Sequence, residues 1–269
     1  MAGELDEVKY QVAVANRILA ELGLATGILA SLGHASMRVP SAPDRFVVKG
    51  RGYKMDALAA MQPADMVVCD LEGYKVDGPP GSTQCFEVKM HSCIYKLRPD
   101  VQSVVHVHPR FAVLMSILGG ELVPMCQEGV HPGQGLHRWA LGEQFPVYPH
   151  LKTIQTDEEG MEVARALGDH TAILLQGHGA TTVGATLEDS VMNMATLEEQ
   201  ARMNWYARCA AGPDHPHITP EQVRGFLGRP KLAELPHFQE VLAERTEPRV
   251  GGVWQYYSEQ VMGLVWCLY

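Results

Sequence analysis

Three features of the sequence predict a mixed α/β fold. The chain has 269 residues, of which 46% are hydrophobic and 20% are charged, and it is long enough for one large domain with a full core. Short runs rich in β-branched residues, such as Val101–Arg110, predict buried strands. Longer runs with apolar residues three and four positions apart, such as Leu5–Leu22, predict amphipathic helices between the strands.

The predicted elements alternate along the chain. Periodic apolar positions predict helices over Leu5–Leu22, Glu87–Arg98, Phe111–Leu118, Glu158–Leu167 and Leu187–Ala211. Further strands are predicted over Arg45–Lys49, Met66–Asp70 and Ala172–Gln176, and a hairpin over Asp70–Gly78. We assign residues 1–212 to one catalytic domain. Residues 213–269 form an extension with two short helices, Glu221–Leu227 and Phe238–Glu244, and an aromatic tail that must pack on the domain or on a neighbouring subunit.

Two segments lack a clear helix or strand pattern. Ala25–Arg38 is rich in glycine and small residues, which predicts a turn that carries His34, Ser36 and Arg38. Such a turn offers backbone amides and a cation to an anionic group, or it is an ordinary turn with a solvated arginine. Glu121–Tyr148 is a long irregular loop, which either covers a site or is a surface excursion.

Charge and composition exclude several classes of protein. The formal net charge of −9 argues against nucleic acid and anionic membranes as partners. No apolar run approaches the ~20 residues of a membrane span, and the acidic start M-A-G-E-L-D-E has no apolar signal core. The six cysteines are scattered without a C-x-x-C pair, which is typical of reduced thiols. We therefore expect a cytoplasmic protein.

Histidines gather where predicted strands end. His106 and His108 are two residues apart, so a strand places them on the same face. His178 follows the strand Ala172–Gln176 and lies between two glycines, which leave its ring uncrowded. Glu87 starts the helix that leads into the His106 strand. Taken singly, each of these residues has a structural explanation. Glu87 suits a helix N-terminus, and the histidines suit hydrogen-bonded polar turns. Together, one carboxylate and three imidazoles predict an open site for a divalent metal.

Five motifs make the chain resemble the class II aldolase/adducin family. In order, they are G-H-A-S-M-R, D-L-E-G-Y-K-V-D-G, E-V-K-M-H-S-C-I-Y-K-L-R-P-D, S-V-V-H-V-H-P and L-L-Q-G-H-G-A-T-T-V-G. The segment from Glu87 to Pro109 is specific, whereas the first and last motifs are weak when taken alone. The resemblance covers Leu5–Gly212, which is most of the chain.

This resemblance implies a three-layer α/β/α sandwich around a mostly antiparallel central sheet. It also implies one divalent metal per subunit, either Zn²⁺, Mn²⁺ or Fe²⁺, with Glu87 as a ligand or as the acid/base catalyst. Three residues would bind this metal: His106, His108 and His178. Members of the family are commonly homotetramers with sites between subunits. A C-terminal tyrosine of a neighbouring subunit often reaches the site, and the resemblance implies this catalytic role for Tyr256 or Tyr257.

Departures from the sugar-phosphate enzymes of the family narrow the expected function. Those enzymes usually have asparagine after the glycine of the first motif, where this chain has His34. Their phosphate-binding pairs are replaced here by Lys49–Tyr53 and Ser82–Phe86. The G-H-x-S-x-R form resembles the branch that decarboxylates hydroxylated aromatic acids, and also the iron oxygenases that shorten prenylated hydroxyphenylpyruvates. The predicted substrate-binding residues are His34, Ser36 and Arg38.

Three functions follow, in order of preference. The first is metal-dependent cleavage of a carbon–carbon bond, by decarboxylation or retro-aldol reaction, in a small hydroxylated or oxo carboxylic acid of aromatic type. The second is a non-heme Fe(II) oxygenase that acts on an aryl-pyruvate or an aryl-hydroxy acid. The third is a non-catalytic scaffold of the adducin kind. Adducin-like members lack the metal histidines that this chain retains, so the scaffold comes last.

Overall fold

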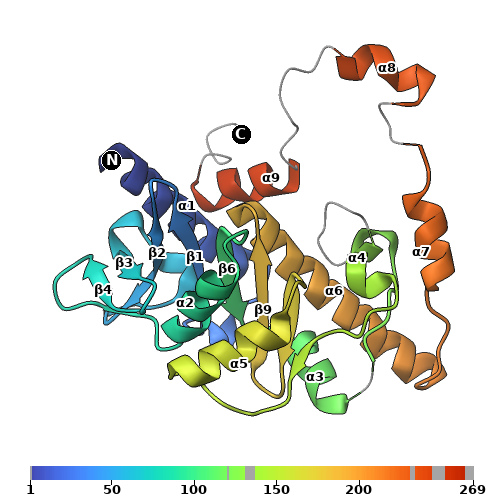
Figure 1. Cartoon of the computed structure of the whole chain (residues 1–269), viewed down its shortest axis with the longest axis horizontal. Helices are drawn as coiled ribbons and strands as arrows, with labels where there is room; N and C mark the ends of the chain where they lie inside the picture. Colours follow the sequence, from blue (N-terminus) through green and yellow to red (C-terminus); the bar gives the residue numbers. More distant parts are fainter. Residues whose placement is uncertain (1, 120, 131–136, 231–233, 244–251, 264–269) are drawn as a thin grey trace.

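Strands and helices alternate along the computed structural model, which describes residues 2–119, 121–130, 137–230, 234–243 and 252–263 (Figure 1). The strands are β1 Gly33–Val39, β2 Ala42–Arg51, β3 Met66–Asp70, β4 Lys75–Asp77, β5 Thr83–Gln84, β6 Ser103–Val107, β7 Val147–Tyr148, β8 Ala172–Leu175 and β9 Gly179–Gly184. The helices are α1 Ala2–Glu21, α2 Val88–Leu97, α3 Arg110–Leu118, α4 His137–Ala140, α5 Asp157–Leu167, α6 Leu187–Ala211, α7 Pro220–Leu227, α8 Pro236–Ala243 and α9 Gly252–Val261. Short 3-10 helices lie at Gly27–Leu29, Leu58–Ala60, Pro63–Asp65 and Gln127–Val130.

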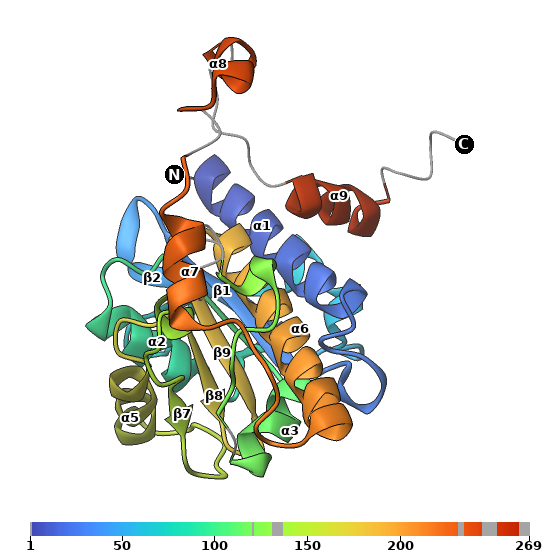
Figure 2. The ribbon, with the colours of Figure 1, turned by 90° about the vertical axis from the view of Figure 1, so that its right-hand side faces the viewer.

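The described strands form one sheet in the order β4-β3-β2-β1-β6-β9-β8-β7, with β5 paired to β2. Every described pair is antiparallel except β7 with β8. Helices α1, α3 and α6 enclose an apolar core on one face, and α2 and α5 enclose another on the opposite face (Figure 2). The predicted three-layer sandwich with a mostly antiparallel sheet is confirmed.

The predicted turn over Ala25–Arg38 is wrong in its second half, because residues from Gly33 onward form the buried strand β1. This strand pairs with β2 on one edge and with β6 on the other. Gly33 allows the close pairing, since a Cβ atom there would lie 2.6 Å from Val107 Cγ1 and 2.9 Å from the His106 carbonyl. Its φ of 123° is also one that side chains rarely adopt.

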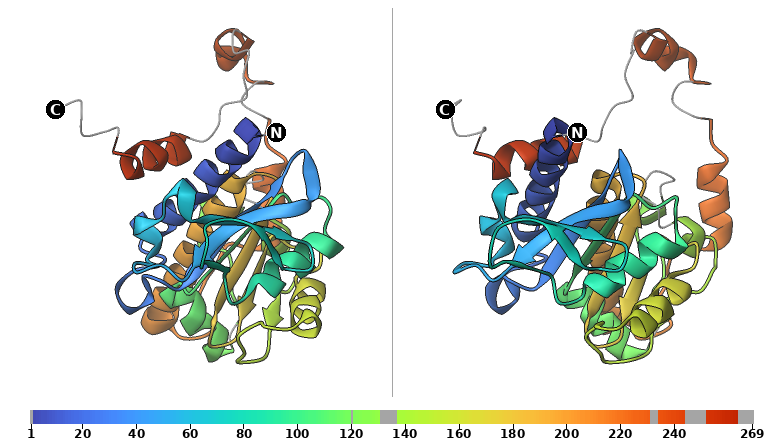
Figure 3. Two further views of the ribbon diagram at one scale, coloured as in Figure 1. Left: turned by 90° about the vertical axis from the view of Figure 1, so that its left-hand side faces the viewer. Right: turned by 60° about the vertical axis from the view of Figure 1, so that its left-hand side comes forward.

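The C-terminal extension contacts the core through two of its helices. Val223 of α7 is buried, and Trp254 and Tyr257 of α9 pack against the core cluster that α1 helps to form. Helix α9 lies next to α1 (Figures 2 and 3). The predicted helix over Phe238–Glu244 is found as α8, although Glu244 lies outside the described residues. The domain boundary at residue 212 stays a prediction.

The loop Glu121–Tyr148 contains the short elements α4 and β7. Trp139 anchors one side of it, because its indole nitrogen donates a hydrogen bond to the Leu122 carbonyl at 2.5 Å. Residues 131–136 lie outside the described part, so the predicted covering role stays a prediction. Among the described residues, the helices are too short or too polar to cross a bilayer.

Helices α2 and α5 pack closely at Gly160. A substitution at this glycine tests the packing that holds α2 on the sheet. A Cβ atom at Gly160 would lie 2.6 Å from the Lys89 carbonyl and 2.8 Å from Cys93 Sγ. We expect Gly160→Ala to lower the free energy of unfolding by about 1–3 kcal/mol in urea titrations, because the helices must move apart. Gly225→Ala in α7 is the matched control, since open space surrounds Gly225. Equal effects of the two substitutions would contradict this packing argument.

Candidate metal centre

His106 and His108 lie where β6 meets the start of α3. The His106 ring is fully buried, and its Nε2 atom lies 3.0 Å from Nε2 of His108. The helix that follows is fixed by a carboxylate from α6, because Glu198 accepts hydrogen bonds from the backbone nitrogens of Phe111 at 3.0 Å and Ala112 at 2.9 Å. The alternation of the strand and the anchored helix start therefore set both imidazoles side by side.

His178 comes from the tight connection between β8 and β9. Its ring centroid lies 5.0 Å from that of His106 and 4.7 Å from that of His108. The glycine after it is essential to this approach, because a Cβ atom on Gly179 would lie 2.5 Å from the Val107 carbonyl and 3.0 Å from each of the other two rings. Three rings can meet here only because residue 179 has no side chain.

Glu87, the residue just before α2, completes the cluster. It precedes the first helical residue, but its carboxylate makes no capping hydrogen bond. Instead, Oε2 lies 3.4 Å from His106 Nε2, and Oε1 lies 3.4 Å from His178 Nε2. The backbone nitrogen of Ile154 donates a hydrogen bond to Oε1 at 3.0 Å. The carboxylate is thus directed into the cluster and is not used to cap its own helix.

These side chains have the chemistry that a divalent cation needs. The four ligand atoms of Glu87, His106, His108 and His178 all lie within 4.8 Å of one another. Burial and the neighbouring rings lower the pKa of His108 to about 3, so its imidazole is neutral at pH 7. Burial alone would raise the pKa of Glu87, but the surrounding histidines outweigh it and leave the pKa well below its usual range. Imidazoles with one carboxylate fit Zn²⁺, Mn²⁺ or Fe²⁺.

Thr181 on β9 orients His106. Its hydroxyl lies 3.1 Å from His106 Nδ1, which leaves Nε2 as the nitrogen that points into the cluster. Such outer partners fix the ring and tautomer of a metal-binding histidine. The sequence interpretation missed Thr181, because a threonine on a buried strand has no distinguishing pattern.

A row of polar side chains runs from this cluster into the protein between β1 and α2. His34 Nε2 lies 3.9 Å from Glu87 Oε2, and His34 Nδ1 lies 2.6 Å from Nε2 of His91. Ser36 Oγ lies 2.6 Å from Nδ1 of His91 and 2.8 Å from the hydroxyl of Tyr95. His34 therefore borders the cluster, whereas Ser36 lies fully buried one step behind it.

Arg38 ends this row, away from the cluster. Its guanidinium donates to the carbonyls of Pro43 at 2.5 Å, Tyr95 at 3.0 Å and Val101 at 3.3 Å, and it lies over the Tyr95 ring. The arginine is buried and saturated by backbone carbonyls. Arg38 therefore supports β1 and α2 in this structure, and its predicted substrate contact stays a prediction.

Two further polar residues near His34 were not predicted. His91 is completely buried on the inner face of α2, and with His34 and Cys85 it forms a second group of three metal-ligating side chains. Lys49 of β2 is 1% exposed, and burial lowers the pKa of its ammonium group. The spacing of Glu87, His91 and Tyr95, four residues apart on one helix, could have shown that all three face the same way.

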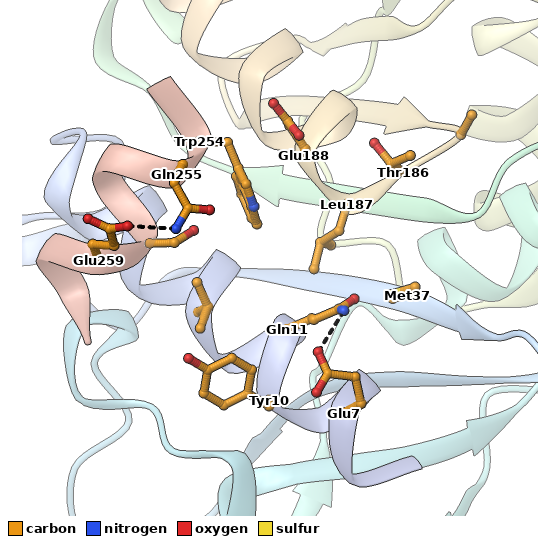
Figure 4. A pocket seen from close by; sticks show the side chains of 13 residues that line it. Glu7, Tyr10, Gln11, Met37, Thr186, Leu187, Glu188, Trp254, Gln255 and Glu259 are labelled. Atoms are coloured by element: carbon orange, nitrogen blue, oxygen red, sulfur yellow. Dashed lines mark hydrogen bonds between the residues drawn. The ribbon is translucent and has the colours of Figure 1, made fainter. Parts of the chain in front are cut away.

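Tyr256 and Tyr257 lie on α9, which packs near the other end of the sheet. A cavity of about 470 Å³ between α1, α9 and the start of α6 is found there (Figure 4). Tyr10 and Trp254 are among its lining residues, and the described lining contains no histidine, lysine or arginine. Within one chain, these tyrosines are therefore remote from the histidine cluster. Their predicted catalytic role requires a neighbouring subunit and stays a prediction.

A cleft of about 450 Å³ adjoins the cluster at His108. Its walls combine apolar side chains, including Leu29 and Phe111, with two arginines and two glutamates: Arg110, Arg202, Glu198 and Glu199. Pockets of roughly 300–1,000 Å³ hold small organic ligands. The cleft is therefore large enough for a one-ring acid that reaches the histidine cluster.

Comparisons with known proteins agree with this geometry. Residues 10–205 match the family model described as the class II aldolase and adducin N-terminal domain. The chain is 31% identical to a 3,4-dihydroxyphthalate decarboxylase of Rhodococcus jostii (strain RHA1), over 78% of this chain and 84% of that protein. It is 27% identical to a 4-hydroxy-3-prenylphenylpyruvate oxygenase/4-hydroxy-3-prenylbenzoate synthase of Streptomyces roseochromogenus subsp. oscitans, over 77% and 70% of the two chains. Its fold resembles that of the L-fuculose 1-phosphate aldolase from Glaciozyma antarctica PI12, with a TM-score of 0.73, 23% identity and coverage of 97% and 90%.

Thr181 provides a test of the cluster as a metal centre. We expect Thr181→Val to weaken zinc binding by about 10- to 100-fold, because His106 loses the partner of its Nδ1 atom. Competition with a chromogenic chelator measures this affinity. Thr182→Val is the matched control, since the Thr182 hydroxyl donates to the Ser190 carbonyl on α6 at 2.7 Å. Equal zinc affinities for the two variants would contradict the assignment.

The buried His91 predicts how stability depends on pH. Burial and the His106 ring lower the pKa of His91 to about 3, whereas an unfolded histidine titrates near 6.5. Below pH ~6.5 the unfolded chain binds a proton that the folded chain does not bind, so stability is lost as the pH falls. We expect His91→Gln to reduce the slope by about 1.4 kcal/mol per pH unit between pH ~4 and ~6. Urea unfolding of metal-free protein measures both slopes, and parallel curves would refute the prediction.

Proposed function

Because the chain belongs to the class II aldolase and adducin family, we propose that it is a metal-dependent lyase that breaks a carbon–carbon bond. The proposed reaction is a decarboxylation or a retro-aldol cleavage, and the substrate is a small hydroxylated or oxo carboxylic acid of aromatic type. The observation that carries this proposal is the convergence of Glu87, His106, His108 and His178 within 4.8 Å. A scaffold protein has no need of such a buried ligand set.

His106, His108 and His178 would hold the divalent metal. When bound, such a metal is a Lewis acid that polarises a carbonyl or phenolic oxygen of the substrate. Neutral imidazoles leave the positive charge of the cation largely uncompensated, so it remains available to the substrate. The anionic Glu87 lies among these rings, and we propose that it either completes the ligand set or moves a proton during the reaction.

Residues around the cluster supply binding and orientation. His34 borders Glu87 at 3.9 Å and is proposed to contact a substrate oxygen. The cleft at His108 offers an apolar wall for a ring, and Arg110 is a cation beside it, whereas Arg202 pairs with Glu199. The similarity to the 3,4-dihydroxyphthalate decarboxylase supports an aromatic acid with neighbouring oxygen substituents as the substrate.

A second candidate function is an Fe(II)-dependent oxygenase. The similarity to the prenylphenylpyruvate oxygenase favours it, and three histidines with open positions permit iron to bind. Both functions use the same ligand set, so consumption of dioxygen is the property that separates them.

We also propose a homotetramer in the cytoplasm. Apolar side chains at the surface near His178 support a subunit contact there, since Ile117 is 55% exposed, Leu151 is 77% exposed, and both lie close to Gly177. A neighbour seated on this patch could bring its Tyr256 or Tyr257 to the cluster.

The proposal predicts near-stoichiometric metal and a metal-dependent activity. We expect anaerobically purified protein to carry about one Zn²⁺, Mn²⁺ or Fe²⁺ per chain and to release CO₂ from a hydroxylated aromatic acid, with 3,4-dihydroxyphthalate as the first probe. His106→Ala should abolish both the metal and turnover, because it removes a central ligand. Elemental analysis and CO₂ release measure the two properties.

His237→Ala is the control for this substitution, because His237 is exposed on α8. Retention of activity after metal removal would sink the lyase proposal. If iron-loaded protein consumes dioxygen in proportion to turnover, the oxygenase replaces the lyase as the proposed function.

A further inference from the structure

The row between β1 and α2 contains buried polar side chains that lie behind His34, away from the metal cluster. The side chains of Ser36, His91 and Tyr95 are each at most 1% exposed, and none of them belongs to the four-residue metal cluster. They nevertheless form a continuous series of contacts that ends at His34: 2.8 Å from Tyr95 to Ser36, 2.6 Å from Ser36 to His91, and 2.6 Å from His91 to His34. Buried polar groups are costly unless each proton has an acceptor, so the direction of the series can be worked out.

Tyr95 is the first hydrogen-bond donor of this series. Among the described residues, the one side-chain acceptor in contact with its hydroxyl is Ser36 Oγ, so the Tyr95 proton must point there. Ser36 then has two acceptors for its own proton, namely His91 Nδ1 at 2.6 Å and the Val104 carbonyl at 3.4 Å. The much shorter contact selects His91.

The remaining steps follow because an imidazole nitrogen that accepts a hydrogen bond carries no proton, so the other nitrogen of the ring must carry one. Because His91 accepts at Nδ1, its proton is on Nε2 and is donated to Nδ1 of His34. Because His34 accepts at Nδ1, its own proton is on Nε2. That nitrogen faces Glu87 Oε2 at 3.9 Å, a separation too long for a hydrogen bond.

We propose that Tyr95, Ser36 and His91 are positioning residues that hold His34 in the Nε2–H tautomer and aim this N–H at the substrate oxygen that gains negative charge. The tautomer itself follows from the contacts alone, whereas the role toward substrate rests on the proposed lyase function. His34 donates a hydrogen bond and keeps its proton. The reverse direction of the series would leave the Tyr95 hydroxyl proton without an acceptor in the apolar surroundings of Phe46.

Nitrogen NMR on protein labelled with ¹⁵N-histidine tests the tautomer directly, without metal or substrate. Protonated and bare imidazole nitrogens resonate far apart, and His34→Asn identifies the His34 signals. We expect a bare Nδ1 and a protonated Nε2 on His34 in the wild type. A protonated Nδ1 would overturn the proposal, whatever the activity of the protein. Two bound metal ions per chain, one of them on His34, Cys85 and His91, would also overturn it.

Matched substitutions at His91 test the positioning role. His91→Gln keeps an N–H donor in the position of Nε2, and we expect it to retain the Nε2–H tautomer of His34 and a kcat within about threefold of wild type. His91→Leu removes this donor, and we expect a mixture of tautomers and a kcat lowered by about 100-fold with little change in KM, as for the loss of a transition-state hydrogen bond. Equal kcat values for Gln and Leu would refute the role toward substrate.

Tyr95→Phe extends the test to the far end of the row. The ring under Arg38 is retained while the starting donor is lost, so the His34 signals should shift toward the other tautomer. Zinc content separates this proposal from the proposed function. Variants that bind zinc as the wild type does but lose the tautomer support the positioning role. Wild type that shows the expected tautomer but cleaves no aromatic acid refutes the proposed lyase and leaves the assigned tautomer standing.

Discussion

The candidate site depends on the close contact between the β8–β9 connection and the end of β6. Gly179 lies against the Val107 carbonyl so tightly that a single added carbon atom would collide with it at 2.5 Å. This contact sets the distance between the ring of His178 and those of His106 and His108. The position of β6 between β1 and β9 then fixes the cluster to the centre of the sheet. The ligand geometry is thus a consequence of backbone packing, and the side chains add their chemistry to it.

The protonation states of Glu87 and His108 suit the binding of a cation. Desolvation and the neighbouring rings lower the pKa of His108, and the histidines around Glu87 lower the pKa of its carboxyl group, so this imidazole is neutral and this carboxylate is an anion at pH 7. These two ligands therefore lose no proton when a cation binds. In the adjacent row, the hydrogen bonds themselves fix which nitrogen of each histidine carries a proton.

Sequence patterns were informative where period and residue type agree. The β-branched run around His106, the glycines around His178 and the helix that starts at Glu87 each showed their structure locally, and the family motifs supplied the architecture. β1 was missed because Gly33, His34, Ser36 and Arg38 have low strand propensity and follow a segment of small residues, although polar and apolar residues alternate from His34 to Val39. The pairing of His91 with His34 could not be predicted, since a contact across 57 residues of sequence leaves no local signal. The carbonyl partners of Arg38 could not be predicted, because Pro43 lies on the paired strand β2 and Tyr95 on α2, which only folding brings against Arg38.

The hydrogen bonds between Glu198 and the start of α3 connect the cleft wall to the cluster. Glu198 lines the cleft and also holds the backbone nitrogens of Phe111 and Ala112, three and four residues beyond His108. One carboxylate of α6 thus belongs to the cleft wall and also fixes the backbone that follows His108. The shape of the cleft and the position of this histidine therefore depend on the same pair of hydrogen bonds.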